Sequence, residues 1–94
     1  MLIHLRLTDP QIGAIQCRDW SEEPVMQRRY RCGDSHLMFT PEERDALAAE
    51  VNDASNAEDE HAQQLRREGE LECARHAARA ARVLSNLYGR ILRA

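Results

Sequence analysis

The sequence predicts an α+β fold: a small antiparallel or mixed sheet of two to three short strands, two capped helices and one long C-terminal helix. Two segments 32 residues apart, His4 to Thr8 and His36 to Thr40, share the pattern His, Leu, any residue, apolar residue, Thr. A helix-starting signal follows each of them. The final 37 residues, Glu58 to Ala94, place apolar and arginine side chains on opposite sides of a 3.6-residue period, which is typical of an amphipathic helix.

The first unit consists of a strand near Leu2 to Leu7 and a short helix. Thr8 and Gln11 match a capping box, in which the Thr hydroxyl accepts an orphan N–H and the Gln side chain reaches back. Ile12 and Ile15 supply the apolar spacing of the helix that follows.

The stretch from Val25 to Tyr30 is predicted as a further strand, because Val25 and Tyr30 flank two arginines. The turn residues Cys32 to Ser35 would join it to a strand at His36 to Phe39 as a hairpin. This strand has the weakest sequence support of the three.

The second unit repeats the first. Thr40 and Glu43 form another capping box, and Leu47 and Val51 give the helix its apolar face. The polar run from Asn52 to Ala57 predicts a helix end and a short linker. Eight comparable positions are too few to separate a duplication from a coincidence, and both interpretations stay open.

The long helix is expected to span 58–94, with Gly69 as its weak point. Its first part is acidic, whereas Cys73 to Ala94 holds five arginines and no acid. We predict that these arginines form a basic partner-binding face: Arg75, Arg79, Arg82, Arg90 and Arg93. The opposite side is a candidate surface for self-association or for packing within the chain: Ala77, Ala80, Leu84, Leu87 and Ile91.

A chain of 94 residues predicts one domain, with 1–57 as its strand–helix part and 58–94 as its long helix. At this size only about 60 to 65% of the unfolded chain's surface is buried, so a partner or a second copy would add stability. No apolar run is long enough to span a bilayer, and the first residues lack the features of a signal peptide. We therefore expect a cytoplasmic protein that does not enter membranes.

Acidic residues gather between residues 42 and 60. They form a second candidate partner-binding face: Glu42, Glu43, Asp45, Glu50, Asp53, Glu58, Asp59 and Glu60. Such a face could imitate the phosphates of a nucleic acid. The preference of helix N-termini for acids explains most of these residues without any partner, and is the favoured interpretation.

Three widely spaced cysteines cannot all pair within one chain, and we interpret them as small core residues. A zinc site is a weak alternative, with two thiols and two imidazoles as candidate ligands: Cys32, His36, Cys73 and His76. No catalytic motif is present, so no catalytic residue, enzyme activity or cofactor is predicted.

The function favoured by these observations is protein binding. The expected partner is a larger protein or ribonucleoprotein complex that the chain blocks or adapts, and a homodimer is expected as well. In size and composition the chain is similar to the short proteins of phages and mobile elements, including anti-CRISPR proteins, which implies an inhibitor of a host system. Two alternatives remain: a nucleic-acid-associated regulator that uses the arginine face, and a helix-mediated assembly factor. The net charge of −3 disfavours direct nucleic-acid binding.

Overall fold

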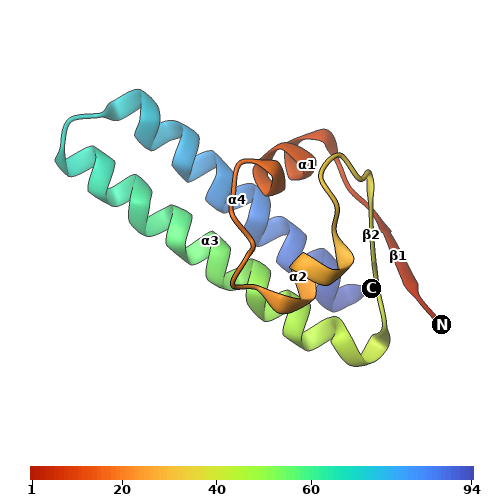
Figure 1. Ribbon diagram of the computed structural model, residues 1–94. Coiled ribbons are helices and arrows are strands. Elements are labelled where there is room, and N and C mark those ends of the chain that lie inside the picture. The colour runs from red at the N-terminus through yellow and green to blue at the C-terminus, as the bar shows by residue number, and fades with distance from the viewer.

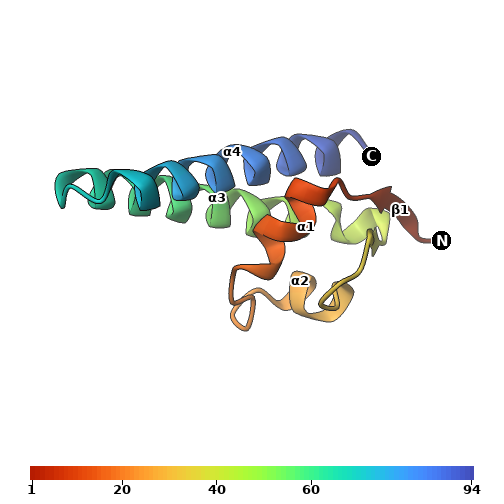
Figure 2. The ribbon, with the colours of Figure 1, turned by 90° about the horizontal axis from the view of Figure 1, so that it is seen from above.

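The computed structural model describes all 94 residues and confirms the α+β class. Two long antiparallel helices form one layer, and the N-terminal elements form a second layer on one side of it (Figure 1, Figure 2). The elements follow in the order β1 (Ile3–Arg6), α1 (Asp9–Gln16), α2 (Pro24–Arg29), β2 (His36–Phe39), the short 3-10 helix η1 (Pro41–Glu43), α3 (Arg44–Arg67) and α4 (Leu71–Arg93). None of the helices is long and apolar enough to cross a membrane.

The two strands that share the sequence pattern pair with each other. β1 and β2 are antiparallel, and Leu5 lies opposite Leu37, which is its own counterpart in the repeat. His4 pairs with Met38, and His36 with Arg6, so the pairing has a local two-fold axis at Leu5. We call this two-stranded sheet the ribbon.

Both predicted capping boxes are confirmed. The Gln11 backbone N–H donates to Thr8 Oγ1 at 3.3 Å, and the Thr8 N–H donates to Gln11 Oε1 at 3.0 Å. The same pair of bonds joins Thr40 and Glu43, at 3.2 and 2.9 Å. Because the ribbon is antiparallel, the two caps follow opposite ends of it.

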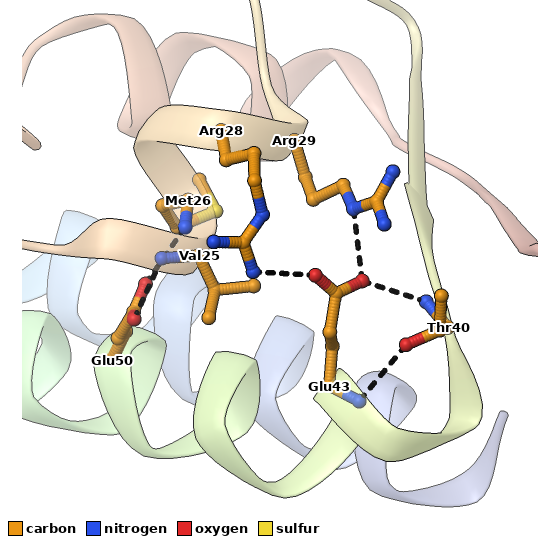
Figure 3. A network of polar contacts seen from close by, with 7 residues as sticks. All are labelled: Val25, Met26, Arg28, Arg29, Thr40, Glu43 and Glu50. Atoms are coloured by element: carbon orange, nitrogen blue, oxygen red, sulfur yellow. Dashed lines mark hydrogen bonds and ion pairs between the residues drawn. The ribbon is translucent and has the colours of Figure 1, made fainter.

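The predicted strand at Val25 to Tyr30 is wrong, since most of this stretch lies in α2. Pro24 occupies the first turn, where its missing N–H costs nothing. Glu50 of α3 accepts hydrogen bonds from the backbone N–H groups of Val25 and Met26 at 3.0 and 2.8 Å (Figure 3). A carboxylate from another helix thus caps α2, and this long-range contact decides the local conformation.

The single helix predicted for 58–94 is also wrong. Helix α3 begins at Arg44, continues through the expected linker at Asn52 to Ala57, and ends at Arg67. Gly69 then adopts φ +80°, its N–H donates to the Arg66 carbonyl, and the Glu70 N–H donates to the Leu65 carbonyl. These two bonds form a Schellman motif, which reverses the chain into α4.

The core lies where the two layers meet. Its fully buried large side chains come from the ribbon, α1, α2, α3 and α4: Phe39, Ile15, Met26, Leu37, Leu47, Leu84, Leu87, Ile91 and Val51. We call the elements around this core the body. The hairpin of α3 and α4 extends beyond the body, and the molecule measures 48 × 24 × 21 Å (Figure 1). We call residues 58–80, which include the turn between the helices, the tip.

Candidate functional site

The arginine face of α4 divides into free and held side chains. Arg75, Arg79 and Arg82 are exposed and form no hydrogen bond or ion pair within the chain. Arg90 is half-buried and donates from Nη1 to Gln11 Oε1 at 2.7 Å. Arg93 is exposed and forms no hydrogen bond or ion pair either, but it is the last residue of α4, at the end of the helix away from the tip.

Three of the free guanidinium groups lie towards the tip, and we call Arg75, Arg79 and Arg82 the basic edge. They lie on one side of α4 at spacings of four and three residues. Arg75 and Arg79 also line a shallow hollow of about 190 Å³ together with Glu72 and His76. Such a row offers many N–H donors to carboxylates or phosphates, with the fork geometry that allows bidentate contacts.

Other arginines of the chain are used internally. Arg18 Nη1 lies 3.2 Å from Glu58 Oε1, and its guanidinium stands 5.5 Å from the centre of the Trp20 ring. Arg28 and Arg29 both donate to the carboxylate of Glu43, at 2.6 and 2.8 Å (Figure 3). The basic edge differs from these residues because none of its guanidinium groups forms an ion pair within the chain.

The predicted acidic face is smaller than expected, because three of its members form contacts within the fold. Glu43 closes a capping box and binds two arginines, Glu50 caps α2 and is buried, and Glu58 pairs with Arg18. The others are exposed: Glu42, Asp45, Asp53, Asp59 and Glu60.

The contacts of Glu43 change its acidity. The backbone N–H of Thr40, followed by the guanidinium groups of Arg28 and Arg29, lowers the pKa of this carboxyl from 4.5 to about 2. Glu23 behaves in the opposite way: burial, followed by the negative charges of Glu50 and Asp53, raises its pKa. Glu43 is therefore held as a carboxylate by its contacts, whereas Glu23 takes up a proton more readily than an ordinary glutamate.

The surface predicted for self-association is already covered within the chain. Ala77, Leu84, Leu87 and Ile91 are buried, and α4 makes most of its tertiary contacts with α3. Only Ala80 of this set is half-exposed. A second copy could reach this surface only if the hairpin opened.

The prediction that the cysteines are small core residues is wrong, because all three are exposed. Cys17 ends α1, Cys32 lies in the turn before β2, and Cys73 lies in the first turns of α4, at the tip. The structure does not bring Cys32, His36, Cys73 and His76 together, and it contains no group of three or more His, Cys, Asp or Glu side chains suited to a metal ion.

A second hollow, of about 290 Å³, opens between α1 and α2. Trp20 and Tyr30 form part of its wall, and Trp20 Nε1 donates to the Ile15 carbonyl at 2.9 Å. This bond fixes the loop after α1, so the hollow follows from how that loop folds back. No sequence pattern predicts this hollow, because the residues of its wall share no common spacing.

In comparisons of sequence and of structure, no protein-family model, curated protein or solved structure matches this chain.

Proposed function

We propose that this protein is a binding module that docks onto an acidic surface of a larger protein or ribonucleoprotein machine, and so blocks or adapts that machine. The observation that supports it is the basic edge, whose three guanidinium groups have no partner within the chain. They are carried by a helix of 23 residues that is packed along its length against α3, so their spacing is fixed before binding.

The position of the basic edge suits docking. Both chain termini lie at the body end of the molecule, and the tip projects in the opposite direction (Figure 1). A partner can therefore approach the tip without meeting the ribbon or α1. Carboxylates on the partner would pair with the arginines, and exclusion of water at the centre of the contact would strengthen the pairs.

Within this class we propose the narrower function of a phage or mobile-element inhibitor of a host system, such as an anti-CRISPR protein. Its support is the small size and acidic character of the chain together with a docking surface on a rigid arm. The nucleic-acid-associated regulator remains the second candidate, because the same guanidinium groups bind phosphates.

The test is retention from a bacterial lysate by the protein immobilised through either terminus, which leaves the tip free. Arg75→Gln/Arg82→Gln removes two charges from the basic edge, and Arg6→Gln/Arg31→Gln removes two from exposed arginines elsewhere. We expect the first variant to lose about tenfold or more of the affinity for a stoichiometric protein partner and the second to keep it. Equal retention by both variants contradicts the proposal, and retention that disappears with nuclease supports the second candidate.

A further inference from the structure

We propose that this chain also associates with itself side by side, the basic edge of one copy lying against α3 of the next. This inference rests on the proposed function, since it names a partner for the same three arginines. The surface on α3 consists of exposed residues on the side turned away from α4, and we call it the acidic edge: Ala46, Ala49, Asp53, Ala57 and Glu60.

The two edges lie on opposite sides of the hairpin. Helices α3 and α4 pack together through their buried residues, among them Val51 of α3 and Leu84 of α4. The members of the acidic edge recur every three or four residues and are all exposed, so they form one stripe along α3. Every copy therefore carries a basic edge on one side and an acidic edge on the other.

The charges of the two edges have matching spacing. Asp53 and Glu60 are seven residues apart, as are Arg75 and Arg82. Seven residues correspond to about two helical turns, or about 10.5 Å. Helices α3 and α4 are antiparallel (Figure 1). A neighbour in the same orientation would therefore place Arg75 opposite Glu60 and Arg82 opposite Asp53.

The heights of the charges along the hairpin agree as well. Ser55 Oγ donates to the Ala81 carbonyl at 2.7 Å, which fixes the level of α3 against α4. Asp53 lies two residues before Ser55, and Arg82 lies one residue after Ala81. Opposing charges on two neighbouring copies thus meet after an axial shift of about one residue, or about 1.5 Å.

Small side chains between the charges allow the helices to approach. In the same register Ala57 of one copy faces Ala78 of the next, and Ala49 faces Asn86. Side chains of this size leave room for the longer arginines to reach across to the carboxylates. The acidic edge therefore matches the basic edge in charge, in spacing and in steric bulk.

The contact joins the basic edge of one copy to the acidic edge of another. An open assembly of any length therefore still has one free basic edge and one free acidic edge at its two ends. Such an interface produces an open row or, if the rotation closes, a ring. Exposed ion pairs are individually weak and are screened by salt, so association is expected at high protein concentration and low ionic strength.

The experiment measures the weight-average mass of the purified chain by analytical ultracentrifugation over a range of concentrations. At low salt we expect the mass to rise from 10.8 kDa with concentration, by about twofold or more. At a salt concentration of about 1 M it should return to the monomer value.

Two variants separate the edges. Arg75→Gln/Arg82→Gln disables the basic edge, and Asp53→Asn/Glu60→Gln disables the acidic edge; each alone should remain monomeric at low salt. An equimolar mixture should form a one-to-one dimer and nothing larger, because only one intact contact can form. Arg6→Gln/Arg31→Gln, which removes the same charge as the first variant, should associate like the unmodified chain.

A chain that stays monomeric at every concentration overturns this inference, as does association that survives the loss of either edge. The proposed function fails separately, through equal lysate retention by the basic-edge variant and its control. A monomeric chain whose basic-edge variant still loses its lysate partner therefore contradicts self-association alone.

Discussion

The body and the tip of the same helical hairpin are held together in different ways. In the body, α3 and α4 contribute large side chains such as Leu47 and Leu87 to a core that also contains Phe39 of the ribbon and Met26 of α2. In the tip, the fully or nearly buried residues are alanines: Ala62, Ala74 and Ala77. The body therefore supplies most of the apolar burial, and the tip is a thin arm of two closely packed helices.

The body therefore provides the stability of the fold, whereas the tip mainly exposes charged side chains. The body can hold the fold because its elements from both layers share one core, whereas the tip beyond Glu58 has no second layer (Figure 2). Because no second layer covers it, much of the tip's surface is exposed, including the charged side chains of Arg75 and Arg79. Four substitutions test this separation, in decreasing order of expected effect.

The largest effect is expected for Phe39→Ala, which opens a cavity in the body. Phe39 is fully buried, and truncating such a ring costs about 3 to 5 kcal/mol of unfolding free energy. Urea denaturation followed by circular dichroism measures this loss. Met38→Ala, at the exposed neighbouring position, is the control and should change stability by about 0.5 kcal/mol or less. Similar losses for both would mean that the body core does not dominate stability.

Glu50→Ala tests the contact that ties α2 to α3. The backbone N–H groups of Val25 and Met26 would lose their acceptor, at a cost of about 1 to 3 kcal/mol. We expect a lower urea midpoint and faster amide exchange in α2. Asp53→Ala on the same helix is exposed and should leave α2 protected. Unchanged exchange in α2 after loss of Glu50 would show that its N-terminus is held by other contacts.

Gly69→Ala addresses the tip alone. A Cβ at φ +80° costs about 1 to 2 kcal/mol, although no other atom stands in its way. The expected result is faster amide exchange in the first turns of α4, with slow exchange preserved around Leu87. Gly13→Ala is the matched control, because Gly13 is helical and has free space. Equal effects at Leu87 and in the tip would contradict the separation of the two regions.

The last test concerns the pH dependence of stability rather than its value at neutral pH. The pKa of Glu43 is lowered from 4.5 to about 2 in the folded state, so its carboxylate stabilises the fold above pH 4.5. That contribution is lost as the pH falls from 4.5 towards 2. Glu43→Gln should therefore show a shallower loss of unfolding free energy over this range than the unmodified chain. Parallel curves would mean that Glu43 ionises alike in the folded and unfolded states.

How far the fold follows from the sequence depends on whether the signals are local. Both capping boxes were predicted correctly, since Thr8 with Gln11 and Thr40 with Glu43 act over three residues. Helix α2 was missed because Glu50, twenty-four residues after Met26, provides its cap. The continuation of α3 through Asn52 to Ala57 was missed because polar residues resemble a linker, until Ser55 finds the Ala81 carbonyl.

The candidate site shows the same limit. Helical periodicity correctly grouped Arg75, Arg79 and Arg82 on one exposed side of α4. It gave no means of telling that Gln11 holds Arg90, because that contact joins residues 79 positions apart. Nor could it tell structural acids such as Glu43 from free ones such as Glu60, since the difference lies in which arginines the fold brings near.

The two-fold pairing of the ribbon determines what the turn between its two halves has to do. Leu5 faces its own counterpart Leu37, and each strand leads into its own capping box, so two similar pieces, each a strand and a capped helix start, are related by a two-fold axis. The turn at Gly33 connects them and is exposed. Its main contribution is a high effective concentration of one piece beside the other, and a chain cut there would keep every strand pair and both caps.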